Sequence, residues 1–399
     1  MSENTANEIS RSKQKRMDIE NARKDQRRKK IQSRLTAIII FLAVIGVVGL
    51  SYLIYRINKD NSGLLSTDTY NKYLTEEGLI ENVTPADYVQ FDYKSLTYSR
   101  ADLLPDEATV DADIASTCES LAKLSEDTGL TTASENKISL SYDATIGGVS
   151  YNAVQQQDYT IGSGSVSDQF DELLPGHHPG DNFQAEITYP ADYYDTELAG
   201  VTVTYNITIH GIYVVPEFTD ELVAENFGNI ASTVEEYRTY LTEEYFKSNL
   251  KEAITDSLTN GCTVLQYPQD YLANVEKIYL AQNENQFNYY NQMFYNSLSS
   301  YAYNSVYEMY GFTSDEEYRS SVHSMAQSDV AFYLSVMTVY AGEGMTNTRE
   351  DVMNYYYEQG YDDASFQELL TQYGYNYLAQ MALADKVTNY LVDTVTVTE

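Results

Sequence analysis

Side chains of the kinds that usually carry catalysis are few in this chain, and their spacing matches no common catalytic arrangement. Neither a serine–histidine–aspartate set nor a pair of carboxylates stands out as a candidate for nucleophilic or acid–base work. The adjacent His177 and His178 lie between two Pro-Gly pairs, which indicates a turn rather than two metal ligands. The cysteines, Cys118 and Cys262, could form a disulfide or stay as two free thiols. The sequence therefore predicts no metal and no cofactor.

Tyrosine is the abundant functional side chain, with 39 copies in 399 residues. Most of them lie in the second half of the chain, notably in 289–310 and 355–357. A tyrosine ring offers a large apolar area with a polar rim, and only two torsions become fixed on contact. These rings could pack helix against helix, or they could form a surface that touches many partners loosely. So many rings cannot all be buried, so we expect some to be exposed.

The charge of the chain separates a basic start from a long acidic remainder. The formal net charge is −34, with 59 acidic and 25 basic residues, which argues against a nucleic-acid partner. Residues 35–55 contain no charged side chain and are long enough to cross a hydrocarbon core of about 30 Å. Basic residues precede this segment in 27–34, and positive charge stays on the cytoplasmic side. The sequence predicts a single-pass protein of the cell membrane, with a cytoplasmic N-terminus, an extracytoplasmic body and the lipid bilayer as a partner.

The elements beyond this segment fall into two kinds. A helix is expected after Pro105, because apolar residues recur there at a spacing close to helical: Val110, Ile114, Cys118, Leu121 and Leu124. Apolar and polar residues alternate from Ile138 and again in 201–209, which predicts strands of an antiparallel sheet. A short helix at 167–174 would cover that sheet, with Ser167 or Asp168 as its cap. From Thr219 onward the pattern predicts helices, at 219–226, 232–258, 268–297, 300–310, 314–341, 347–358 and 364–393.

The stretch 136–228 resembles the FKBP-type peptidyl-prolyl isomerase domain in the version found in trigger factor. The residues that carry this resemblance are the turn IGSG at 161–164, the run QFDELLPG that follows, TYPADYYDTELAG at 188–200 and EFTDELV at 217–223. The helical remainder is similar to the chaperone arm of that family, so the resemblance covers roughly 110–399. Trigger factor begins with a ribosome-docking domain, which this sequence does not match, so ribosome binding is not implied.

The resemblance implies an apolar pocket that lowers the barrier to rotation about an X-Pro bond. It assigns wall and floor rings to Tyr142, Tyr151, Phe170 and Tyr205, an aliphatic position to Val166, and a hydrogen-bonding flap residue to Tyr193 or its neighbour Tyr194. Such a site needs neither a nucleophile nor a proton relay. Asn152 and Ser167 depart from the family pattern, since acidic and aliphatic residues are common there. These departures imply weak activity.

These observations together predict an α+β protein with one transmembrane helix, an FKBP-like sheet domain and a helical chaperone arm. The expected ranges are a tail at 1–34, the membrane helix at 35–55, a spacer at 56–80, a lead-in and helix at 81–134, the isomerase domain at 135–215 and the chaperone domain at 216–399. The expected function is isomerisation and folding of exported polypeptides that contain X-Pro bonds. The alternative is a non-catalytic holdase whose FKBP-like module only grips peptides; an adhesive surface protein is a third, weaker reading.

Overall fold

The computed structural model describes residues 65–193, 195–296 and 303–399. The described residues form two compact units: unit 1 comprises 65–103 and the described part of Phe246–Glu399, and unit 2 comprises the described part of Leu104–Tyr245. The predicted isomerase range, 135–215, lies inside unit 2, whereas the predicted chaperone range, 216–399, is divided between the two units.

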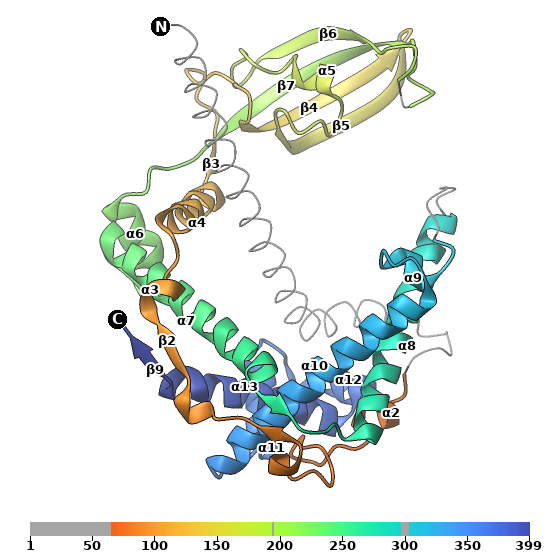
Figure 1. Ribbon diagram of the computed structural model, residues 1–399. Helices are drawn as coiled ribbons and strands as arrows, with labels where there is room; N and C mark the ends of the chain where they lie inside the picture. Colours follow the sequence, from red (N-terminus) through yellow and green to blue (C-terminus); the bar gives the residue numbers. More distant parts are fainter. Residues whose placement is uncertain (1–64, 194, 297–302) are drawn as a thin grey trace, which may run out of the picture. The chain divides into compact units, whose positions relative to one another are not determined.

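Unit 2 contains a five-stranded sheet in which every pairing is antiparallel (Figure 1). The long strand β7 is central, with β4 along one edge and both β6 and β3 along the other; β5 pairs with the far side of β4. Its elements are β3 (Lys123–Ser125), β4 (Lys137–Ile146), β5 (Val149–Thr160), α5 (Asp168–Asp171), β6 (Asn182–Thr188) and β7 (Thr202–Val214).

One face of this sheet holds the core of unit 2. Alternate residues of β4 and β7 are buried, as period-two patterning requires, and Ile138, Leu140 and Ile207 are fully enclosed. The short helix α5 adds Phe170 to the same cluster. Ser167 caps α5 by accepting a hydrogen bond from the Phe170 N–H at 3.1 Å, which confirms one of the two predicted caps.

A second core in unit 2 joins three helices, α4 (Glu107–Ser120), α6 (Asp220–Phe227) and the first part of α7 (Val234–Asn260). The predicted apolar stripe is confirmed at Val110, Ile114 and Cys118, which are the buried residues of α4. The prediction was wrong for its last two residues, because the helix ends at Ser120: Leu121 is the C-cap and Leu124 lies on β3. Thr219 caps α6 through a bond from the Leu222 N–H, also as predicted. The helices that precede and follow the sheet strands in the sequence therefore share one apolar cluster.

Unit 1 is mainly helical. Its long helices are the end of α7, α8 (Gln269–Asn296), α10 (Asp315–Gly342), α11 (Arg349–Glu358), α12 (Asp363–Tyr373) and α13 (Tyr375–Thr394). Shorter elements are α2 (Thr67–Asn71), η1 (Pro85–Asp87), β1 (Val89–Gln90), η2 (Tyr93–Ser95), β2 (Thr97–Ser99), α3 (Arg100–Leu103), β8 (Thr263–Val264), α9 (Val306–Met309) and β9 (Thr396–Thr398). β1 pairs antiparallel with β8, and β2 pairs parallel with β9.

The last predicted helix, 364–393, is two helices in the structure. Gly374 ends α12 and precedes α13 with a φ of 78°, a value that interrupts a right-handed helix. The Asn71 side chain fits against this break: its Nδ2 donates to the Tyr373 carbonyl at 3.0 Å, and its Oδ1 accepts from the Asn376 N–H at 2.7 Å. The backbone groups freed by the break are thus satisfied by a side chain some 300 residues earlier in the chain.

The segment after residue 65 belongs to the core of unit 1, where the sequence predicted a spacer. Leu74 and Ile80 are each 2% exposed and pack with Leu334 of α10. Asn274 of α8 donates to the Thr69 carbonyl at 2.9 Å. Short, mixed patterns such as this one carry no clear period, so the sequence alone could not show that they are buried.

The membrane part of the predicted fold class and localisation needs correction. Within 65–193, 195–296 and 303–399 no helix is both long and apolar enough to cross a bilayer. α7, α8 and α10 have sufficient length, but charged side chains recur along each of them. The predicted membrane segment, 35–55, lies outside the described residues. The fold is therefore a mixed helix-and-sheet structure without an assigned membrane helix, and the predictions of bilayer binding and of a single-pass location are not retained.

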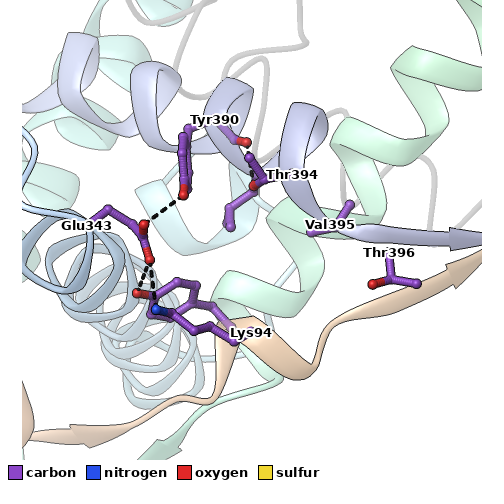
Figure 2. Close-up of a pocket in the computed structure, with 8 residues that line it drawn as sticks. Lys94, Glu343, Tyr390, Thr394, Val395 and Thr396 are labelled. Carbon is purple, nitrogen blue, oxygen red and sulfur yellow. Dashed lines mark hydrogen bonds and ion pairs between the residues drawn. The ribbon is translucent and has the colours of Figure 1, made fainter.

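A carboxylate network lines an open pocket of about 240 Å³ formed by η2 and the ends of α10 and α13 in unit 1 (Figure 2). Glu343 accepts hydrogen bonds from the hydroxyls of Tyr93 at 2.6 Å and Tyr390 at 2.8 Å, and Lys94 Nζ lies 3.2 Å away. These three donors favour the ionised form and lower the pKa of Glu343 to about 2.

This network predicts an acid-sensitive contribution to unit 1. Because the folded pKa lies below the ordinary value of 4.5, the contribution is complete above that pH and is lost as the pH falls towards about 2. We expect Glu343→Gln to have a lower free energy of unfolding than the parent at neutral pH. The two free energies should become equal as the pH approaches about 2. Urea unfolding of both proteins between these pH values measures the difference, and a constant difference would contradict the network's role.

Candidate functional site

Three of the residues assigned by the family resemblance meet in unit 2. The ring centroids of Tyr142 and Phe170 lie 5.2 Å apart, those of Phe170 and Tyr205 5.1 Å apart, and those of Tyr142 and Tyr205 5.7 Å apart. The interplanar angles of 59° to 68° are the tilted and edge-to-face arrangements that aromatic pairs prefer. Tyr142 comes from β4, Tyr205 from β7 and Phe170 from α5, so sheet and helix together position the trio.

Two further tyrosines belong to this cluster and were not assigned from the sequence. Tyr159, on β5, packs edge-on against Phe170 with centroids 5.7 Å apart. Tyr189 follows β6, and its hydroxyl forms a hydrogen bond of 2.9 Å with the hydroxyl of Tyr205. Tyr189 lies in the TYP run and Tyr159 lies two residues before the IGSG turn, so both belong to the stretch that carries the family resemblance.

The other assigned residues lie around the trio. Val166 and Tyr193 are half-buried and pack against the cluster, and the Tyr193 ring lies 4.6 Å from that of Tyr189. Tyr151, on β5, is 41% exposed. Burial raises the pKa of both Tyr142 and Tyr205, and the phenols of Tyr189 and Tyr151 add to the shift. Tyr194, the alternative to Tyr193, lies outside the described residues.

The ring cluster is closed to solvent at its centre. Tyr142 is 6% exposed, Phe170 0% and Tyr205 3%. Burial, followed by the hydroxyl of Tyr189, raises the pKa of Tyr205 far above its ordinary value, so this phenol stays protonated. The cluster contains the side chains expected of a ring-lined pocket, but the rings themselves fill the space that a pocket would leave. Val166, Tyr193 and Tyr151 surround these central rings.

The loop that leads into α5 is tied to this cluster by a buried carboxylate. Asp171 Oδ1 accepts from the Tyr159 hydroxyl at 2.7 Å, and its Oδ2 accepts from the Gly164 N–H at 2.8 Å. Burial and this bond raise the pKa of Tyr159 to about 12. Both polar groups are thereby satisfied, which a buried carboxylate requires.

Unit 1 has a second group of tyrosines, gathered around one carboxyl group. Asp329 of α10 accepts a hydrogen bond from Tyr279 of α8, and the phenols of Tyr333 and Tyr377 also raise the pKa of Tyr279. Burial raises the pKa of Asp329 to about 6. Each of the four residues is half-buried as a whole, while its carboxyl or phenol group is enclosed by protein.

The described residues show no group of three or more histidine, cysteine or acidic side chains placed to hold a metal ion. Cys118 in unit 2 and Cys262 in unit 1 are free thiols in this structure. His177 stacks on Phe183 with ring centroids 3.6 Å apart, and the His178 N–H donates to Asp181 at 2.8 Å. The histidine pair therefore shapes the predicted turn.

Comparison with known proteins finds distant similarity in sequence. No family model matches the chain. Trigger factors of Streptococcus pneumoniae, strains Hungary19A-6 and JJA among them, are 25% identical to it over 286 residues, which cover 68% of this chain and 64% of theirs. The match thus spans less than two thirds of the length of these relatives. A solved structure described as "Promiscuous Substrate Recognition in Folding and Assembly Activities of the Trigger Factor Chaperone" aligns over 81% of this chain and 72% of its own, with 16% identity and a TM-score of 0.39. The chain is similar in sequence to trigger factors.

Proposed function

We propose that this protein is a folding chaperone that binds unfolded polypeptide, as its similarity to trigger factors suggests. The observation that carries the proposal is the sequence match, 25% identical over 286 residues, since it extends through most of the chain. The half-buried tyrosines of unit 1 support it, because rings with polar rims can contact varied side chains at low entropic cost. The acidic surface also supports it by keeping chaperone molecules apart while they hold an aggregation-prone client.

A light-scattering assay tests this proposal. A chemically denatured client is diluted into buffer with or without the full chain, and aggregation is followed over time. We expect near-complete suppression at a small molar excess, and little effect from an equally acidic folded protein added as the control. Aggregation that proceeds equally with both proteins would contradict the proposal.

A second function, peptidyl-prolyl isomerisation, is favoured by the gathering of Tyr142, Phe170 and Tyr205 in one cluster. Amide resonance gives rotation about the X-Pro bond a barrier of about 18–20 kcal/mol and makes the reaction slow. An apolar site strips water from the carbonyl and favours the twisted, less polar amide, while the rings hold that geometry. The half-buried Val166 and Tyr193 would be the first side chains that a substrate meets. Because the central rings are closed, we expect weak activity that requires the rim to open.

A refolding assay limited by proline isomerisation tests this second function. With catalytic amounts of the full chain we expect acceleration of the slow phase by a fewfold, reduced by Tyr205→Phe, which keeps the ring but removes the bond to Tyr189. Asn182→Ala, on the far edge of the sheet, serves as the control and should leave the rate unchanged. An unchanged slow phase with folded parent protein would remove the isomerase function and leave the holding function intact.

A further inference from the structure

The sheet of unit 2 ends in an unusually long outer strand. β5 runs for 12 residues and pairs with β4 on one side; in the described part of the chain no strand pairs with its other side. An outer strand presents a row of unpaired backbone N–H and C=O groups, and natural sheets usually protect such an edge with charge, proline or a short length.

The sequence of β5 lacks charge, proline and short length as protections, and its pairing with β4 shifts register at two places, opposite Leu140/Tyr142 and Ala144/Thr145. Val149–Gln157 contains no charged residue and no proline, in a chain whose formal net charge is −34. The one acidic residue that follows, Asp158, is neutralised by Lys137 at 3.0 Å. The strand at the opposite edge, β6, is shorter, at 7 residues, and carries Glu186.

The side chains of β5 also take little part in the core. From Val149 to Asp158 every residue is exposed except Val154, which is half-buried, and Val149 is 71% exposed. β6 instead alternates between exposed and more buried positions. β5 is therefore held mainly by its backbone pairing with β4, together with side-chain bonds such as those of Asn152 to Tyr142 and of Gln156 to Ser139.

We propose that the free edge of β5 binds an extended segment of an unfolded polypeptide as an added strand. This inference deepens the proposed chaperone function and rests on it for the kind of partner. An added strand is recognised through backbone hydrogen bonds, so it suits clients of unrelated sequence. The uncharged edge favours a segment of low charge, and the acidic chain as a whole disfavours an acidic one.

The position of the edge fits this use. Tyr151 lies on β5 and is 41% exposed, and the Nδ2 of its neighbour Asn152 lies 3.4 Å from the Tyr142 hydroxyl. A segment paired with β5 would lie about 5 Å from that strand and would pass the rim of the ring cluster. A second copy of this chain is a poorer occupant, because two bodies of the same strong negative charge repel each other.

Backbone-modified peptides test the added strand. The probe is a fluorescent ten-residue peptide of alternating threonine and valine, in three forms: unmodified, N-methylated at the odd positions, and N-methylated at the even positions. One edge of a strand uses alternate N–H groups, so one methylated form should lose at least tenfold in affinity for the full chain while the other binds like the parent. Equal affinities of the two methylated forms, whether retained or lost, overturn the proposal.

A matched pair of substitutions locates the edge. Gln155 on β5 and Gln184 on β6 are both exposed glutamines. For a probe peptide with one central glutamate, we expect Gln155→Lys to strengthen and Gln155→Glu to weaken binding, each by about two- to fivefold, while the same changes at Gln184 have no effect. An effect confined to Gln184, or a dimer of the free chain that Gln155→Lys dissociates, overturns the proposal. These readouts are affinities, so they do not depend on isomerase activity. If the chain suppresses client aggregation but the probe peptide does not bind, the strand-addition proposal is refuted and the chaperone function stands.

Discussion

Replacing Phe170 by alanine is expected to lower the free energy of unfolding of unit 2 by about 3–5 kcal/mol. Phe170 is fully buried and lies within 6 Å, centroid to centroid, of three tyrosine rings. Its loss removes both the transfer free energy of a large apolar side chain and the contacts of those rings. The surrounding rings come from β4, β5 and β7, which backbone pairing holds in place, so they cannot collapse fully into the cavity.

Hydrogen-exchange mass spectrometry of the full chain measures this effect, because it reports each unit separately. Amides of β4 and β7 should lose protection, while those of α10 in unit 1 should keep theirs. Tyr151→Ala, which removes an exposed ring, is the control and should cost less than about 1 kcal/mol. A loss for Phe170→Ala no larger than for the control would show that the rings do not form the core of unit 2.

Gly78→Ala is expected to cost unit 1 about 3 kcal/mol or more. Gly78 has a φ of 80°, and a Cβ there would lie 2.3 Å from the backbone N of Gln380 and 2.5 Å from the carbonyl C of Ala379. Both atoms belong to α13, whose backbone cannot move aside without breaking helix hydrogen bonds. The cost combines the strain of a left-handed alanine with the separation of residues 74–80 from α13.

Gly360→Ala separates these two causes. Gly360 has a similar φ, 87°, but no atom lies within 4 Å of the position of an added Cβ. We expect a cost of about 1–2 kcal/mol from backbone strain alone. Urea unfolding with hydrogen exchange at α13 compares the variants, and equal costs would show that the contact between Gly78 and α13 does not stabilise unit 1.

Local patterns predicted much of the fold. The spacing of Val110, Ile114 and Cys118 identified α4, and the alternation that begins at Ile138 identified β4, because each pattern matches the geometry of its element. Gly374 was not among the predicted helix breaks, because a single glycine is tolerated inside many helices. Only the contact with Asn71, which the sequence does not show, reveals that Gly374 interrupts the helix. The expected spacer is partly core for a similar reason: its burial depends on α10 and α13, which are distant in sequence.

The candidate site was predicted less completely. The family resemblance gave Tyr142, Phe170 and Tyr205, and the structure brings these three together. It could not indicate that the rings fill their own cavity, because closure depends on the exact packing of Tyr159 and Tyr189. The free edge of β5 was not foreseen either, since an outer strand and a central strand can have the same sequence pattern.

The measurement that tests the central claim most directly is the titration of an unfolded, tryptophan-containing client with the full chain. The chain has no tryptophan, so tryptophan anisotropy reports on the client alone. The client should be kept unfolded by a destabilising substitution, and its folded parent serves as the control. Our account predicts a saturable rise in anisotropy for the unfolded client and none for the folded one. An unfolded client whose anisotropy stays constant, with the chain itself folded, would contradict the chaperone function.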